Sequence, residues 1–205
     1  MIVDLFSPFY WKISINEHNY IKSKYISLIE DNYYDNPNNA DDWVVHTSYS
    51  TKPLKNNIDW SLSLPIYKKY ISDFILEYFG ENRNFNISGN PWYTTYGYGQ
   101  SADTHEHLPD HFSVVHFLKF NKEKHNPITF INPNGHFIKC FIDSNKNIKN
   151  MIDFNNINQS YFHPRYTPDI SEGDLIIFPG QLEHLVDKNK SYDLRTTIAM
   201  NINIL

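Results

Sequence analysis

The chemistry of this chain is concentrated in residues 92–120, which read WYTTYGYGQSADTHEHLPDHFSVVHFLKF. The aromatic and β-branched residues of this stretch favour strands, in which successive side chains point to opposite faces. His105 and His107 are separated by one residue, so we expect both imidazoles to project to the same side. Two imidazoles on one side are half of a metal site, and the other half must come from elsewhere in the chain.

A second segment, residues 173–184, is the obvious supplier of the other half. It reads GDLIIFPGQLEH and ends in His184, about eighty residues after His105, and Arg195 follows inside an otherwise apolar run. An arginine in such a run calls for an anionic partner, because an unpaired buried charge is costly. We therefore expect the fold to bring the two segments together.

The composition favours a single β-rich domain. A chain of 205 residues is long enough to bury a substantial core, and its 15 Tyr and 14 Phe suit a half-buried sheet. We predict one domain over residues 1–205, with a helical support layer over 1–83 and a jelly-roll core over 84–205.

Periodicity predicts two helices in the first part. The first covers Glu17–Asn32 with Asn16 as its cap, and the second begins at Pro65 and ends at Gly80. Trp43–Ser50 is predicted as a strand, and residues 145–158, which are rich in Asn and Lys, as a mobile insert. The later strands are predicted at Asn84–Ser88, Trp92–Gly97, Phe112–Phe120, Ile128–Ile131, Phe137–Ile142, Gln159–Phe162, Leu175–Phe178, Leu182–Val186 and Leu194–Ile204. Such a series of short strands indicates a sandwich or jelly roll.

Charge and cysteine content narrow the class of protein. A formal charge of −5 and a pI near 6.0 give no sign of a basic face for nucleic acid. The single cysteine, Cys140, excludes an intramolecular disulfide and is expected to be a small core residue. With no signal-like N-terminus and no long apolar run, we expect a soluble cytoplasmic protein, in the host cytoplasm if viral, without a membrane partner.

Two motifs make the sequence resemble the 2-oxoglutarate- and Fe(II)-dependent oxygenase superfamily, and within it the prolyl-hydroxylase-like members of phage and bacterial genomes. The first is a Trp, a Tyr and a Gly leading into His-x-His and a strand, and the second is Gly-Asp, an apolar run, Phe-Pro, His and Arg-x-Thr. The residues that carry them are Trp92, Tyr96, Gly99, His105, His107, Gly173, Asp174, Phe178, Pro179, His184, Arg195 and Thr197.

This resemblance implies a double-stranded β-helix buttressed by helices, and an enzyme that uses Fe(II), 2-oxoglutarate and O2. It implies that His105 and His184 bind the iron and that Arg195 pairs with the distal carboxylate of 2-oxoglutarate. The resemblance also suggests cosubstrate contacts from Thr197, Tyr96, Thr94 and Asn201, although relatives often have Asn at position 94. The implied reaction hydroxylates a peptidyl proline or another protein side chain, or a small metabolite, while 2-oxoglutarate loses CO2 to give succinate.

His107 departs from the superfamily pattern, in which the position usually holds Asp or Glu. We consider His107 as the third ligand, Asp110 as a substitute, or a two-histidine site completed by water. Glu106 faces the opposite way if the strand continues through it. For the substrate pocket, the candidates are Trp92, His111, His116 and Arg165.

Two alternative functions remain open. One is a jelly-roll module that holds a metal without turnover, and the other is a cupin-like enzyme with three histidines that does not use 2-oxoglutarate. The sequence leaves the oligomeric state open. The partner of the oxygenase is expected to be its substrate, a protein or a small molecule.

Overall fold

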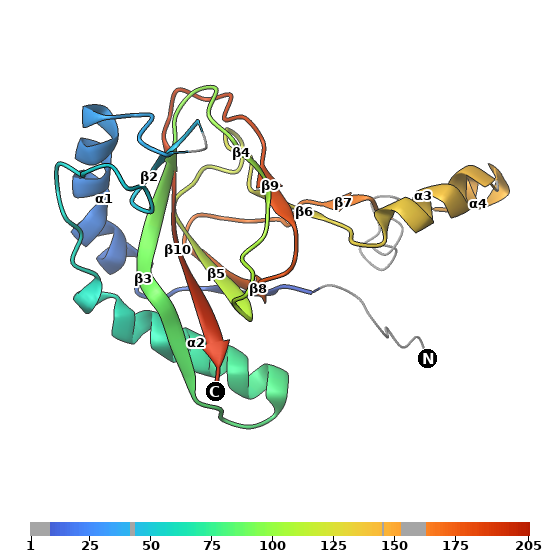
Figure 1. The fold of residues 1–205 in the computed structure, drawn as a ribbon, viewed down its shortest axis with the longest axis horizontal. Coiled ribbons are helices and arrows are strands. Elements are labelled where there is room, and N and C mark those ends of the chain that lie inside the picture. The colour runs from blue at the N-terminus through green and yellow to red at the C-terminus, as the bar shows by residue number, and fades with distance from the viewer. Residues whose placement is uncertain (1–8, 42–43, 145, 153–162) are drawn as a thin grey trace.

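The computed structural model describes residues 9–41, 44–144, 146–152 and 163–205. It is a mostly β fold with two long helices of the first part packed on one face, as predicted (Figure 1). The strands are β1 (Trp11–Ser14), β2 (His46–Thr47), β3 (Phe85–Tyr96), β4 (Ala102–His105), β5 (Phe112–Lys119), β6 (Ile128–Ile131), β7 (Arg165–Tyr166), β8 (Asp174–Pro179), β9 (His184–Val186) and β10 (Arg195–Ile204). The helices are α1 (His18–Asp35), the short 3₁₀ helix η1 (Trp60–Leu62), α2 (Leu64–Phe79), α3 (Gly135–Ser144) and α4 (Lys146–Met151).

The strands form two antiparallel sheets. The larger has the order β1-β8-β5-β10-β3-β2 and the smaller the order β4-β9-β6-β7. The last strand of the chain, β10, lies between β3 and β5, and β4 pairs with β9. Pairing of strands so distant in sequence is typical of a jelly roll. It is this pairing that brings residues near 105 beside residues near 184.

Helices α1 and α2 cover the outer face of the larger sheet. Both have an apolar stripe at helical spacing, and Gly80 ends α2 in the left-handed conformation at φ 73°. The buried residues of this layer include Ile21, Tyr25 and Ile29 of α1, Tyr67, Ile71 and Phe74 of α2, and Val114, Leu175 and Ile198 of the sheet. The opposite face of the sheet, with Phe117, Ile176 and Phe178, packs against Phe130 of the smaller sheet. The larger sheet is therefore packed on both faces, against α1 and α2 on one side and against the smaller sheet on the other.

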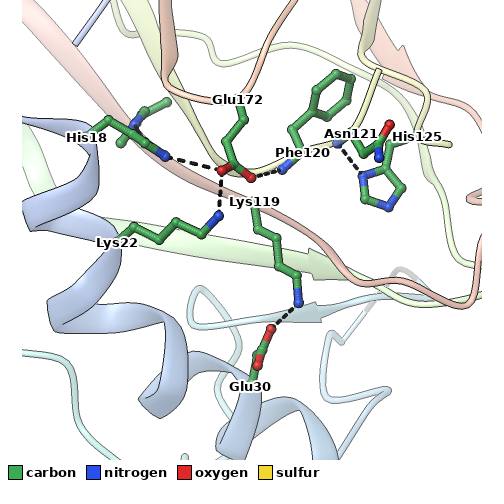
Figure 2. Close-up of polar contacts among 9 residues, drawn as sticks. His18, Lys22, Glu30, Lys119, Phe120, Asn121, His125 and Glu172 are labelled. Atoms are coloured by element: carbon green, nitrogen blue, oxygen red, sulfur yellow. Dashed lines mark hydrogen bonds and ion pairs between the residues drawn. The ribbon is translucent and has the colours of Figure 1, made fainter. Parts of the chain in front are cut away.

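Polar contacts also fix α1 to the larger sheet (Figure 2). The Glu172 carboxylate accepts from Lys22 of α1 and from the backbone N–H of Phe120, and its Oε1 lies 3.5 Å from the Nε2 of His18. Lys119, at the end of β5, pairs with Glu30 further along the same helix. Helix α1 is thus bonded to the end of β5, through Lys119, and to the turn before β8, through Glu172.

The structure corrects three of the predicted strands and the prediction for Cys140. Phe137–Ile142 lies in helix α3 and not in a strand, because Ile138 and Ile142, four residues apart, are the buried pair of that segment. Cys140 on the same helix is exposed and is not a core residue. The strands predicted at Asn84–Ser88 and Trp92–Gly97 are one strand, β3, whose pairing with β10 shifts register between Ala199 and Asn201. This irregularity accommodates the residues between them, which the sequence alone suggests as a turn.

Other differences are smaller. Of the strand predicted at Trp43–Ser50, only His46–Thr47 pairs, and residues 42–43 lie outside the described part. Within the insert predicted at 145–158, residues 146–151 form α4, and the strand predicted at Gln159–Phe162 lies outside the described residues. Helix α1 is preceded by Glu17 without a side-chain cap, so Asn16 does not cap it. The division into a layer over 1–83 and a core over 84–205 stays a prediction, and β1 and β2 of the first part join the larger sheet.

Within the described ranges, no helix combines the length and the apolar character that crossing a bilayer would require.

Candidate metal centre

The pairing of β4 with β9 places two histidines face to face. His105 is the register partner of His184, and their ring centroids lie 4.3 Å apart. Each ring is held by a nearby backbone oxygen: the Nδ1 of His105 lies 2.7 Å from the carbonyl oxygen of Asp103, and the Nδ1 of His184 lies 2.9 Å from that of Leu182. A carbonyl oxygen can only accept, so both rings carry a proton on Nδ1 and offer the lone pair of Nε2 to a metal.

His107 reaches the same place from a loop. Strand β4 ends at His105, and the backbone N–H of His107 then donates to the carbonyl oxygen of Gly180, at 2.8 Å. Its ring centroid lies 5.3 Å from that of His105 and 5.1 Å from that of His184. Because the strand does not continue, Glu106 also borders the cavity, contrary to the expectation for a continuous strand.

The three imidazoles meet the basic requirements of a divalent metal site. One nitrogen of each ring lies within 4.8 Å of the others, close enough for one ion to draw the rings together. Burial lowers the pKa of all three rings, to about 4 for His107, and the proximity of the rings lowers the pKa of His107 and His184 further. Neutral imidazole is the form that binds a metal. This donor set therefore fits Fe(II), although it lacks the carboxylate of the more usual arrangement.

The histidines border a cavity of about 640 Å³ between the two sheets. Its lining combines both histidine segments with the inner faces of β3 and β10 and with residues 40–51. The lining residues are Ala40, Asp41, Thr47, Tyr49, Ser50, Thr51, Trp92, Thr94, Tyr96, His105, Glu106, His107, Leu108, Pro109, Asp110, Val115, Ile128, His184, Val186, Arg195, Thr197, Ala199 and Asn201.

Arg195 is the buried cation of this cavity. Its side chain is 2% exposed, and its Nε and Nη1 atoms have no hydrogen-bond partner within the described structure. The guanidinium lies 4.7 Å from the centroid of Tyr96 and 5.6 Å from that of Phe117. Burial lowers the pKa of Arg195, with Tyr96 opposing the shift, yet a guanidinium remains charged at neutral pH. A buried charge with two unused donors fits the carboxylate of an anionic ligand.

The register of β10 with β3 arranges the cavity wall in rows. Arg195 stands opposite Tyr96, Thr197 opposite Thr94, and Ala199 opposite Trp92. The pairs Arg195–Tyr96 and Thr197–Thr94 form one end of the cavity. At this end the Thr94 hydroxyl donates to the Thr47 hydroxyl. The row of Trp92 lies beside His107, with ring centroids 5.9 Å apart. The predicted residues Tyr96, Thr94, Thr197 and Trp92 are thus brought into the same cavity as the histidines.

Asp110 and Asn201 also border the cavity, but they bond each other. The Asn201 amide donates to Asp110 at 2.9 Å and accepts from the Ser113 hydroxyl at 2.8 Å, and its nitrogen lies 3.5 Å from the Nδ1 of His107. A second amide, that of Asn203, donates to the other oxygen of Asp110. With both oxygens engaged, Asp110 stands outside the group of three metal-binding side chains.

Three of the predicted pocket residues lie elsewhere, which corrects those predictions. His116 faces the helices, because Val115 takes the cavity side of β5, and it is fully buried against Tyr67 and His18. His111 is exposed, and its ring accepts from the backbone N–H of Ile204. Arg165 is exposed on the short strand β7.

Sequence reasoning missed the contribution of residues 40–51. Asp41, Tyr49 and Thr51 line the cavity because β2 pairs with β3 at Thr94 and Thr95. No motif marks these residues, and only the weak strand pattern near Val45 pointed to that pairing. Gly180 was also missed, although it follows the Phe-Pro pair of the second motif.

The fold and the site together define a jelly-roll protein with a metal-binding cavity between its sheets. The chain belongs to the 2OG-Fe(II) oxygenase family, because the model of that family matches residues 90–201, more than half of its length. The family uses Fe(II), 2-oxoglutarate and O2, so the protein is a 2-oxoglutarate-dependent oxygenase. Among curated proteins, none matches the sequence.

Solved structures agree on the fold. A prolyl-4-hydroxylase from Pseudomonas putida is 10% identical with a TM-score of 0.56, over 96% of this chain and 94% of that chain. EctD from S. alaskensis with bound Fe is 14% identical with a TM-score of 0.56, over 96% and 73%. AviO1 from Streptomyces viridochromogenes is 9% identical with a TM-score of 0.59, over 96% and 90%. At these identities the similarity shows the double-stranded β-helix fold and nothing finer.

Proposed function

We propose that this oxygenase hydroxylates a C–H bond of an amino-acid side chain, in a protein or in a small molecule. The observation that supports the proposal best is the convergence of His105, His107 and His184 on one cavity that also holds the buried Arg195, whose Nε and Nη1 atoms have no hydrogen-bond partner. In the balanced reaction, the substrate C–H bond gains one oxygen atom of O2. The other oxygen atom enters succinate as 2-oxoglutarate loses CO2.

The three histidines would hold Fe(II), with His105 and His184 as the pair whose tautomer is fixed by backbone oxygens. When bound, Fe(II) supplies the activation of O2, which no side chain of the protein can perform. His107 is assigned as the third ligand. Asp110 is not assigned to the metal, since it stands outside the group of three converging side chains and is oriented by Asn201 and Asn203.

Arg195 is assigned to the distal carboxylate of 2-oxoglutarate. Its Nε and Nη1 atoms have no hydrogen-bond partner and can donate to a carboxylate, and Thr197 on the same face of β10 can add a hydroxyl. Tyr96 flanks the guanidinium, and Ile128 and Val186 give this end an apolar wall. A carboxylate here is shielded from water, which strengthens its attraction to Arg195. The part of the cavity beside Trp92 and Ala199 is then available to the substrate.

The substrate proposal draws support from two sources. The cavity opens beside an exposed tyrosine, Tyr49, so a side chain attached to a larger molecule could enter it. The structural similarity to a prolyl-4-hydroxylase makes a peptidyl prolyl side chain one option, with small metabolites as another. Fold similarity cannot rank these options, because one fold serves many substrates.

The test of this function is cosubstrate turnover. Purified protein with Fe(II), ascorbate and 2-oxoglutarate in air is expected to release succinate above the rate without protein, and Arg195→Ala is expected to abolish the release. Binding of 2-oxoglutarate to protein loaded with Mn(II) is measured in parallel by calorimetry. A protein that binds Mn(II) but neither binds nor consumes 2-oxoglutarate would instead be a cupin-like metalloprotein or a metal-holding module.

A further inference from the structure

The cavity has two chemically distinct ends. Along β10, Ala199 is four residues from Arg195, which at about 3.3 Å per residue separates their rows by about 13 Å. The Arg195 end carries the cation and the hydroxyls of Thr94 and Thr197. The other end, beside the Trp92 ring, is the substrate end. We define it by Trp92, by Tyr49 against it, by Glu106 and Asp110 on either side of His107, and by Asp41, which bonds Thr51 two residues after Tyr49.

Two aromatic rings form the floor of the substrate end. Tyr49 lies against Trp92 with ring centroids 5.4 Å apart and planes tilted by 52°, and Trp92 in turn lies beside the His107 ring. Ala199, the register partner of Trp92, is small and leaves the space above the floor open. Tyr49 is 77% exposed, so the floor runs from the histidines out to solvent. An elongated apolar chain can lie on these two rings, with its tip at the solvent-exposed edge of the substrate end, which we call the rim.

Three carboxylates border this end. Asp41 accepts from the backbone N–H and the hydroxyl of Thr51, and these hydrogen bonds lower its pKa, so it is ionised at neutral pH. Asp110 accepts from two amides, and Glu106 is exposed between the two histidines of the first motif. Among the lining residues that the structure describes, the one Lys or Arg is Arg195, at the opposite end.

The rim keeps its negative character when Lys52 is included. Lys52 donates to the carbonyl oxygen of Ala40 at 3.2 Å, and its charge acts on Asp41. One ammonium beside three carboxylates still leaves an excess of negative charge. Aromatic faces and carboxylates together are the combination that recognises an organic cation.

We propose that the substrate end binds an unbranched chain that ends in a cation, as in lysine or arginine, and that this chain is the group that the oxygenase hydroxylates. This inference rests on the proposed function. The methylene groups would lie on Trp92 and Tyr49, with a C–H bond turned to the metal centre. The ammonium or guanidinium would lie at the rim among Asp41, Glu106 and Asp110. The source of the chain is either a free amino acid or a peptide, and the test separates the two.

The test compares cationic probes with neutral probes of the same shape. Lysine, arginine, norleucine and citrulline are titrated into protein loaded with Mn(II) and 2-oxoglutarate, and succinate release is measured separately with Fe(II) in air. Capped peptides containing one lysine or arginine form the second arm. We expect each cationic probe to bind at least ten times more tightly than its neutral counterpart, and to raise succinate release. Response to the peptides alone would identify a protein substrate.

Two variants locate the binding. Glu106→Gln and Tyr49→Ala are each expected to weaken binding of the cationic probe about threefold, the size of one exposed ion pair or cation–π contact. Glu123→Gln and Tyr98→Ala, exposed residues that do not line the cavity, are the matched controls. Mn(II) affinity and circular dichroism of each variant verify that the site is intact.

The possible failures are distinguishable. If norleucine and citrulline bind as well as lysine and arginine, or if no cationic probe binds to protein that has taken up 2-oxoglutarate, the cationic substrate is refuted and the oxygenase remains. If 2-oxoglutarate itself does not bind to the Mn(II)-loaded protein, the proposed function is wrong and this inference falls with it.

Discussion

Gly180 lies so close to Asp110 that a Cβ atom on the glycine would stand 2.1 Å from the carbonyl oxygen of Asp110. The same glycine bonds the loop on both sides, since its carbonyl accepts from the His107 N–H at 2.8 Å and its N–H donates to the carbonyl of His111 at 2.9 Å. The turn before His184 is therefore joined directly to the loop that carries His107. A residue with a side chain cannot occupy this position without moving that loop.

Gly180→Ala is expected to displace His107 and to lower the affinity for Mn(II) or Fe(II) about tenfold, as changes around metal ligands commonly do. The overpacking should also lower the free energy of unfolding by about 1–3 kcal/mol. Calorimetric titration with Mn(II) and urea denaturation measure the two effects. Gly135→Ala is the control, because its Cβ would meet its nearest neighbours at an ordinary 3.9 Å.

A double variant tests whether the effect runs through His107. In a His107→Ala background, Gly180→Ala should cause no further loss of metal affinity, because the displaced ligand is already absent. Equal losses in both backgrounds would show that Gly180 acts on His184 or on the fold as a whole.

Much of this centre could be predicted from the sequence. His105, His107 and His184 belong to two motifs whose order and separation imply a jelly roll, and the β4–β9 pairing places His105 opposite His184 as that topology requires. Helix α2 was equally predictable, from its broad apolar stripe and the glycine that ends it. The prediction of the histidine site rests on two complete motifs, and that of α2 rests on apolar residues at helical spacing.

The remainder depends on information that the sequence expresses weakly. The apolar run Phe137–Ile142 is too short to distinguish a strand from a helix by periodicity, and the structure has a helix with Phe137 and Phe141 exposed. The face of β5 that meets the cavity could not be chosen in advance, since Val115 and His116 both have residues on which to pack. Tyr49 reaches the cavity because the two-residue strand before it pairs with β3, and the strand pattern at Trp43–Ser50 does not by itself identify the partner strand.

The three histidines are expected to contribute unequally to metal binding. His105 and His184 have Nδ1 bonded to carbonyl oxygens, whereas the Nδ1 of His107 faces the amide nitrogen of Asn201, a donor whose orientation is set by Asp110. The ring of His107 is therefore not held in the tautomer that offers Nε2 to a metal. His105→Ala and His184→Ala should each reduce Mn(II) affinity more than a hundredfold, and His107→Ala about tenfold. His136→Ala, on the exposed face of α3, is the control, and equal losses at all three sites would contradict the ranking.

Arg195→Lys is expected to separate cosubstrate binding from metal binding. Lysine keeps the positive charge but lacks the planar fork that pairs with a carboxylate through two hydrogen bonds. We expect the affinity of the Mn(II)-loaded protein for 2-oxoglutarate to fall at least tenfold, with Mn(II) affinity unchanged. Arg165→Lys, an exposed position on β7, should change neither quantity. Unaltered 2-oxoglutarate affinity in Arg195→Lys would mean that the cosubstrate carboxylate is bound elsewhere.

His116 links the stability of the fold to pH from behind the site. It is fully buried, its ring nitrogens lie 2.9 Å from the Tyr67 hydroxyl and 3.0 Å from the Nδ1 of His18, and burial lowers its pKa from 6.5 to about 3. Above pH 6.5 the ring is neutral in both folded and unfolded chains, so it adds no pH dependence there. Between pH 6.5 and 3 the unfolded chain takes up a proton that the folded protein does not, so stability falls by up to about 1.4 kcal/mol per pH unit.

His116→Gln should therefore lower the free energy of unfolding at pH 7.5, through lost packing and hydrogen bonds, by about 1–3 kcal/mol. The same variant should lose less stability than the wild type between pH 7.5 and pH 5, by about 1–2 kcal/mol, because it has no imidazole to protonate on unfolding. Urea denaturation of the metal-free proteins at both pH values measures this difference. His136→Gln, at an exposed position of α3, is the control for the substitution itself. A parallel loss in His116→Gln and wild type would mean that the buried ring gains its proton without unfolding, with His18 as the neighbour able to share it.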